Sequence, residues 1–225
     1  MSVNARGHVV RPRRTRGSRV EIMKSSSQAW KVKSSQTVFA GGPLQRVAVE
    51  HVVLPDGREI PDYYRVDMPD YALVFAVTEE DDVLLFRQYR HGIGRVCVGF
   101  PGGALNAGED PAAAAARELA EETGYAAASW RPLGGHVTNA NQRCNVAHLF
   151  LATGCRRVGE AALPDIENPE LLLVPRRELW SRVRLDELAG VAHAALFALA
   201  THPMLEALPD GGNPRYADRA RAAAR

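Results

Sequence analysis

Hydrophobic and polar residues alternate along the early part of the chain in the manner of β-strands. Residues 47–54 and 59–66 both alternate, and the turn sequence PDGR at 55–58 lies between them. This order predicts a β-hairpin, because Pro, Asp and Gly favour tight turns. Two more apolar runs, at 72–78 and 83–90, flank the acidic turn EEDD and predict a second hairpin.

The rest of the chain mixes short apolar runs with helical periodicity. Further strands are expected at 95–100, 130–136, 146–153 and 170–174, and helices at 111–123, 176–183 and 186–201. Strands interleaved with helices predict a layered α/β architecture.

The segment GGALNAGEDPAAAAARELAEETGY, which begins at Gly102, carries the strongest helix signals. Asp110 is a good N-cap, and Pro111 suits the first helical position because its missing N–H would be unpaired there. Five consecutive alanines favour a helix, and Gly124 favours a left-handed stop. A helix over 111–123 is therefore predicted.

Three carboxylates share one face of this predicted helix. Glu118 lies one turn from both Glu121 and Glu122, and Arg117 is spaced to pair with Glu121. An acidic cluster of this kind is either a solvated face or a site for a hard cation such as Mg²⁺, which takes oxygen ligands. The preceding glycine loop, residues 100–103, lets backbone carbonyls approach a ligand closely. Spacing alone leaves both interpretations open.

The order of residues from Gly103 onward narrows the choice. The chain fills each fixed position of a pattern that resembles the signature of the Nudix hydrolase family. The pattern is G, five residues, E, seven residues, REL, one residue, EE, one residue and GY. The resemblance implies an α/β/α sandwich with a mixed sheet and an N-terminal β-hairpin extension. It also implies metal-dependent hydrolysis of a diphosphate that is linked to a further group.

The same resemblance assigns roles to residues of the segment. It implies that Mg²⁺, or Mn²⁺ in its place, is held by the Gly102 carbonyl, Glu118, Glu121 and Glu122. It implies structural roles within the motif for Gly103, Glu109, Arg117 and Gly124.

The sequence LFRQYR at 85–90 resembles the ADP-ribose pyrophosphatase branch of that family. The branch implies ADP-ribose or a related nucleotide sugar as substrate, cleaved to a nucleoside monophosphate and a sugar phosphate. It also implies a homodimer that exchanges N-terminal strands. Arg87, Tyr89 and Arg90 are the substrate-binding candidates, and strand alternation puts the first two on the face opposite Arg90.

Two departures from the branch leave the substrate open. The chain has Pro-Gly-Gly at 101–103 where Pro-Ala-Gly is common, and it has HVTNANQR at 136–143 where a Ser-Pro-Gly segment is usual. Amides and an arginine in the second loop could recognise a different sugar or base through hydrogen bonds.

A general base is expected on a late loop, by resemblance to related pyrophosphatases. The acidic segment PDIENPE at 164–170 stands directly before a strand. Glu167 is the first candidate and Glu170 the second. Glu121 takes the role if neither loop residue removes the proton from the attacking water.

Charge divides the chain into a basic start, an acidic body and a basic end. Residues 1–22 carry six arginines against one glutamate, whereas the whole chain carries only +2. We expect a disordered basic tail at 1–35, a β extension at 36–70, the catalytic domain at 71–203 and a flexible tail at 204–225. The basic residues 1–22 could bind nucleic acid, but their lack of aromatic side chains favours a simple extension.

Composition adds a few expectations. No apolar run is long enough to span a bilayer and the N-terminus lacks a signal-peptide core, so a cytoplasmic protein without membrane partners is expected. The three cysteines have no paired zinc spacing and are interpreted as packing thiols. The alternative to a hydrolase is a non-catalytic Nudix-type module that binds the same nucleoside diphosphate ligand, but three intact like charges favour the enzyme.

Overall fold

The computed structural model describes residues 28–42, 45–162 and 169–202. Most of the two expected tails, and the base candidate Glu167, lie outside these residues. Within them, no helix is long and apolar enough to cross a membrane.

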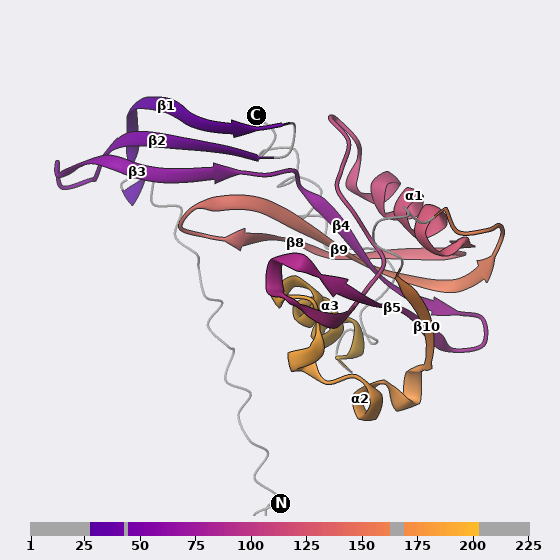
Figure 1. The fold of residues 1–225 in the computed structure, drawn as a ribbon. Helices are drawn as coiled ribbons and strands as arrows, with labels where there is room; N and C mark the ends of the chain where they lie inside the picture. The colour runs from indigo at the N-terminus through magenta and orange to yellow at the C-terminus, as the bar shows by residue number, and fades with distance from the viewer. Residues whose placement is uncertain (1–27, 43–44, 163–168, 203–225) are drawn as a thin grey trace, which may run out of the picture.

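The structure is built around one mixed sheet (Figure 1). Its strands are β1 Lys31–Gly41, β2 Gln45–Val53, β3 Glu59–Asp67, β4 Tyr71–Thr78, β5 Asp82–Arg90, β6 Arg95–Gly99, β7 Tyr125–Ala126, β8 Ser129–Asn139, β9 Arg143–Arg157 and β10 Glu170–Pro175. The main path runs β1-β2-β3-β9-β4-β5-β10, with β6 paired to β5 and both β7 and β8 paired to β9. Strand β9 runs parallel to β3 and β4, whereas the other pairings are antiparallel. Each strand predicted from the sequence is present.

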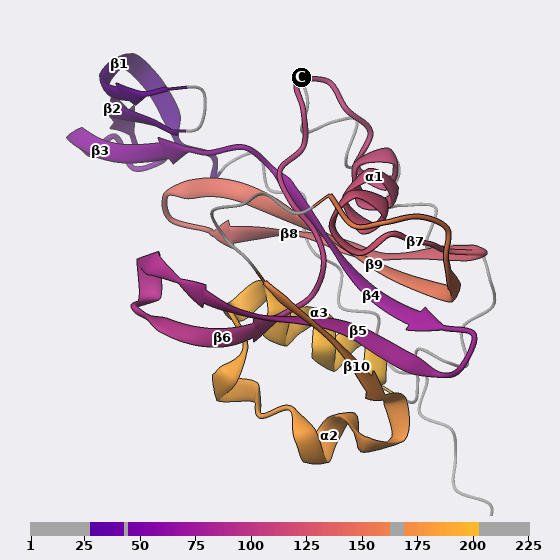
Figure 2. The same ribbon diagram turned by 45° about the vertical axis from the view of Figure 1, so that its right-hand side comes forward.

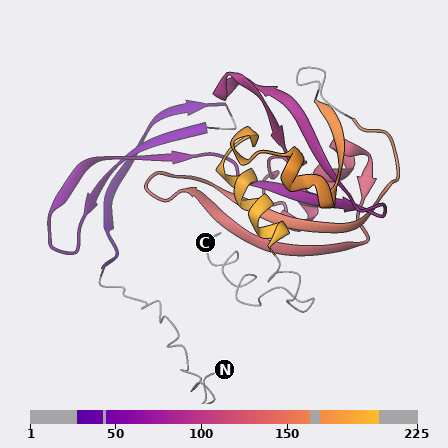
Figure 3. The ribbon, with the colours of Figure 1, turned by 90° about the horizontal axis from the view of Figure 1, so that it is seen from below.

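The first three strands form a curved sheet that stands out from the rest of the molecule (Figures 1 and 3). The predicted hairpin is its β2–β3 pair. Strand β1 was not predicted, and residues 31–35, which we expected in a tail, are its first residues. The side chains of β1 are exposed along almost its whole length, so the strand has no buried alternating positions for a sequence pattern to reveal.

Two helical layers cover the remaining sheet (Figure 2). Helix α1, Pro111–Thr123, lies on one face, and helices α2, Leu179–Arg182, and α3, Val191–Thr201, lie on the other. Strand β4 supplies both sides of the core by alternation: Leu73, Phe75 and Val77 pack in the cluster with α3, and Ala72, Val74 and Ala76 pack in the cluster with α1. The α/β/α sandwich is therefore confirmed.

Helix α1 has the bounds and caps that local signals predicted. The Asp110 carboxylate accepts from Ala112 N at 2.9 Å and Ala113 N at 3.2 Å, which satisfies two orphan N–H groups. Gly124 closes the helix at φ 73°. Ala114 and Ala115 are buried, and their small side chains let α1 lie close to the sheet.

The last helices are shorter than predicted. Of the expected helix 176–183, Arg176–Glu178 is a 3₁₀ turn and only Leu179–Arg182 is α-helical. The prediction of a helix over 186–201 was wrong for its first part. That part contains another 3₁₀ turn and an extended stretch, and α3 begins only after them. Gly190 explains the break, because its φ of 153° is incompatible with a continuous helix.

We predict that Asp110→Ala lowers the free energy of unfolding by about 1 kcal/mol, because two N–H groups of α1 lose their acceptor. Asp110→Asn should retain nearly all the stability, since Asn is an equally good N-cap. Urea denaturation of the three proteins measures both effects. Equal losses in the two variants would contradict the capping role.

Candidate active site

The loop before α1 is fastened along β4. The Pro101 carbonyl accepts from Val74 N and the Gly103 carbonyl accepts from Ala72 N, both at 2.9 Å. Gly102 lies between them at φ 146°, and a Cβ there would stand 2.0 Å from the Ala72 carbonyl oxygen. Only glycine fits at this position.

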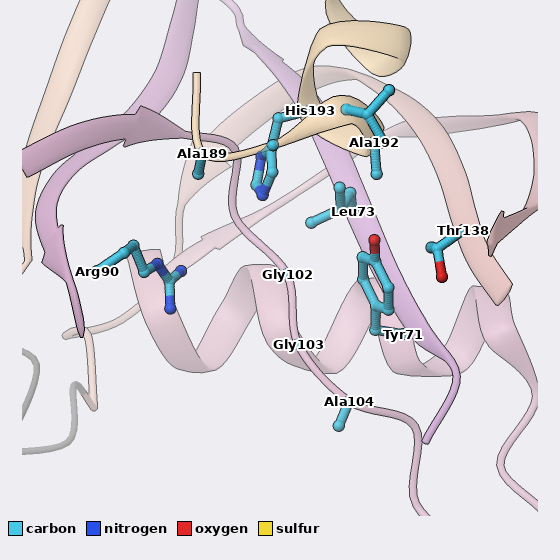
Figure 4. Close-up of a pocket in the computed structure, with 12 residues that line it drawn as sticks. Tyr71, Leu73, Arg90, Gly102, Gly103, Ala104, Thr138, Ala189, Ala192 and His193 are labelled. Carbon is cyan, nitrogen blue, oxygen red and sulfur yellow. The ribbon is translucent and has the colours of Figure 1, made fainter. Parts of the chain in front are cut away.

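The same loop packs directly on the carboxylates of α1. Gly102 N donates to Glu122 Oε2 at 2.8 Å, and a Cβ on Gly103 would stand 2.6 Å from the carboxylate of Glu118. Figure 4 shows the labelled glycines crossing in front of the helix. The structure thus brings together the glycine loop and two of the acidic residues singled out in the sequence.

Arg117 offsets the repulsion between the clustered carboxylates. Its guanidinium donates to both Glu109 oxygens at 2.8 and 2.9 Å, to Glu118 at 2.7 Å and to Glu121 at 3.0 Å. The Arg117 hydrogen bonds are the main reason that the pKa of Glu109 falls to about 2. The predicted pair of Arg117 with Glu121 is confirmed, although Glu121 remains 53% exposed and Glu118 only 13%.

The carboxylates do not converge on one point. In the part of the chain that the structure describes, no three His, Cys, Asp or Glu side chains are grouped to hold a metal ion. The reason is that Glu118 and Glu121 turn toward Arg117, whereas Glu122 turns toward Gly102 N. The donor chemistry nevertheless fits a hard cation, because carboxylate and backbone oxygens surround this corner.

A cavity of about 340 Å³ opens beside the glycine loop. It is lined by Tyr71, Leu73, Arg90, Gly102, Gly103, Ala104, Thr138 and residues 189–193 (Figure 4). Its size lies in the usual range of small-molecule sites, about 300–1,000 Å³.

The three substrate-binding candidates of β5 separate as alternation predicted. Arg90 lines the cavity. Arg87 and Tyr89 point to the other face, where they are 61% and 54% exposed. Glu170, the second base candidate, is the cross-strand partner of Arg87, with 4.0 Å between the carboxylate and the guanidinium.

The amide-rich loop after the motif connects to the N-terminal strands. Its Asn139 side chain accepts from Asn141 N and Gln142 N, each at 3.0 Å, and Arg143 binds Asp67 at 3.0 Å. The Asn139 amide therefore shapes the turn, and Arg143 fastens the turn to β3. Thr138, one residue earlier, is the member that lines the cavity.

His193 is a cavity residue that sequence reasoning missed. Its Nδ1 accepts from Phe100 N at 3.1 Å, and its ring lies nearly parallel to the Phe100 ring. Burial, and then the positive charge of Arg90, lower the pKa of His193 from 6.5 to about 4. A lone histidine in an alanine-rich helix carries no local signal of this placement.

This pKa predicts how stability depends on pH. Between about pH 6.5 and pH 4 the unfolded chain binds a proton at His193 and the folded chain does not, so the free energy of unfolding falls as the pH falls through this window. Tyr71, which also lines the cavity, stays neutral in this window because burial raises its pKa.

His193→Gln should weaken this dependence, because an amide does not titrate. The free energy of unfolding can be measured by urea denaturation at several pH values in this window. Plotted against pH, it should have a slope that is steeper in the wild type by at most about 1.4 kcal/mol per pH unit. Identical slopes in the two proteins would show that His193 titrates normally in the folded state.

Comparison with protein families gives two matches that together span most of the chain. Residues 68–198 match the NUDIX domain, and residues 30–66 match the nucleoside diphosphate sugar hydrolase N-terminal domain. The second match begins at the edge of β1, the strand that the sequence pattern did not reveal.

Individual proteins give similar results. An ADP-ribose pyrophosphatase of Bacillus subtilis is 35% identical over 191 residues, which cover 83% of this chain and 98% of that protein. A methanol dehydrogenase activator of Bacillus methanolicus is 33% identical over an aligned region that covers 59% of this chain and 70% of that protein. The crystal structure of an ADP compounds hydrolase superposes with a TM-score of 0.63 at 18% identity. The superposition covers 76% of this chain and 92% of that chain, which shows a shared fold.

Proposed function

The chain belongs to the Nudix hydrolase family, and on that premise we propose that it hydrolyses a nucleoside diphosphate sugar, with ADP-ribose as the leading substrate. The products are a nucleoside monophosphate and a sugar phosphate. The observation that carries this proposal is the contact of the Gly102–Gly103 loop with Glu118 and Glu122 beside a cavity that Arg90 lines.

The ligands proposed for Mg²⁺ or Mn²⁺ are Glu118, Glu121, Glu122 and the Gly102 carbonyl. When bound, the cation neutralises diphosphate oxygens and lowers the pKa of a coordinated water. Holding it requires Glu121 to leave Arg117, which its exposed position allows. Glu118 is more enclosed and stays beside Gly103.

The chain's own residues position and activate the reactants. Arg90 supplies a fixed guanidinium for a phosphoryl group at the cavity. Arg117 holds Glu109 and Glu118 in place through its hydrogen bonds. The base that takes the proton from water is proposed to be Glu167, then Glu170, then Glu121. The Glu170 side chain is already 62% exposed to water, and its 4.0 Å pair with Arg87 is weak.

The alternative is a Nudix module that binds such a ligand without cleaving it. One relative is named as a methanol dehydrogenase activator, a name that describes regulation of another enzyme. A panel of nucleotide sugars and dinucleotides assayed for phosphate-monoester products with Mg²⁺ separates the two functions. Turnover of ADP-ribose supports the hydrolase, and tight binding of a nucleotide sugar with no turnover supports the module.

We predict that Glu118→Gln or Glu122→Gln lowers kcat by several orders of magnitude with the fold intact, because hard-cation sites depend on carboxylate charge. The control is Glu80→Gln, which removes an exposed carboxylate in the turn between β4 and β5. That variant should retain full activity in the same assay. Full activity of the wild type in excess EDTA would contradict the metal dependence.

We also propose a homodimer formed through the N-terminal sheet. Apolar side chains of this extension are exposed, among them Trp30, Val32, Val38, Phe39 and Tyr64. Strand β1 pairs with β2 on one side and lies at the edge of the described sheet on the other, and such edges readily pair with another chain.

Light scattering should therefore give about twice the chain mass of 24.5 kDa at assay concentration. The mass should stay doubled on dilution to the concentrations at which activity is measured. A fully active monomer would disprove the dimer.

A further inference from the structure

The cavity beside the glycine loop is lined by hydrogen-bond donors. Its polar side chains are Tyr71, Arg90, Thr138 and His193, and none of its lining residues is a carboxylate. Thr138 is not counted among the donors, because its hydroxyl already donates to Asn145 Oδ1 at 2.6 Å. A donor-rich cavity with one permanent positive charge suits a ligand that is rich in acceptor oxygens. A role for this cavity in substrate recognition rests on the proposed hydrolysis of a nucleoside diphosphate sugar.

The hydrogen bond from Phe100 N fixes the tautomer of the neutral His193 ring. Because Nδ1 accepts from Phe100 N, the neutral ring must carry its proton on Nε2. Figure 4 shows the imidazole descending from α3 with its far edge toward Arg90 and the glycine loop. Nε2–H is therefore a donor directed into the cavity.

The surroundings hold the ring in this state. Protonation of Nδ1 would make two N–H groups, those of Nδ1 and Phe100, point at each other with no acceptor between them. The nearby positive charge of Arg90 also disfavours a cationic ring. Neighbouring residues also limit its movement: Phe100 stacks on it with 14° between the ring planes, and a Cβ on Gly99 would stand 3.2 Å from its Cε1.

The walls of the cavity indicate which part of the substrate enters it. Many of the lining residues are small: Gly102, Gly103, Ala104, Ala189, Gly190 and Ala192. Tyr71 is the one large aromatic side chain in the lining. A nucleobase is usually held by stacking on aromatic faces. We propose that His193 is a specificity-determining residue whose Nε2–H donates to an oxygen of the sugar phosphate half of the substrate.

The test compares His193→Phe, which keeps the ring and loses the donor, with His193→Gln, whose amide can accept from Phe100 N and still donate. For ADP-ribose hydrolysis, His193→Phe should raise KM about three- to tenfold with a smaller change in kcat, as expected for one lost hydrogen bond made in both ground and transition states. The inhibition constant of ribose 5-phosphate should rise in parallel. His193→Gln should lie within about twofold of the wild type.

Ala198→Ser, an exposed position on the same helix, is the control for a general effect on α3. An unchanged KM and inhibition constant in a folded His193→Phe protein would overturn the proposal, as would an equal loss in His193→Gln. If the wild type cleaves no nucleotide sugar, the proposed function fails separately. The role of His193 is then decided by calorimetry with ribose 5-phosphate: weaker binding to His193→Phe supports it, and equal or absent binding overturns it.

Discussion

The site depends on the hydrogen bonds and ion pairs of the Arg117 guanidinium. The guanidinium joins Glu109 in the loop to Glu118 and Glu121 on α1, and it also donates to the Ala104 carbonyl at 3.1 Å. Without this charge, the carboxylates would repel one another and the loop would lose its tie to the helix. Arginine suits the position because its planar fork binds two oxygens of one carboxylate while reaching others.

Strand β4 is the second shared element of the site. It supplies buried side chains to both layers of the sandwich, and its backbone receives the glycine loop that faces α1 on one side and the cavity on the other. Because Gly102 tolerates no side chain against Ala72, the distance between the loop and the sheet is fixed. Glu118 and Glu122 therefore lie against this loop, and Arg90 and His193 line the cavity beside it, although these residues come from different parts of the chain.

Sequence reasoning succeeded where the signal was local. The bounds of α1 followed from Asp110 and Gly124, and the faces of β5 followed from alternation. It failed for β1, whose strand depends on pairing with β2, and for the start of α3, where Gly190 interrupts the apolar pattern. His193 could not be predicted because its role depends on Phe100 and Arg90, which approach it only in the folded chain.

We propose that the Arg117-linked carboxylates and the glycine loop form a divalent-cation site. The decisive experiment is diffraction from crystals soaked with Mn²⁺, recorded at a wavelength where manganese scatters anomalously. We expect an anomalous peak that contacts Glu118 and Glu122, with Glu121 released from Arg117. A peak elsewhere, or none at saturating Mn²⁺, would show that the cation does not bind at these carboxylates.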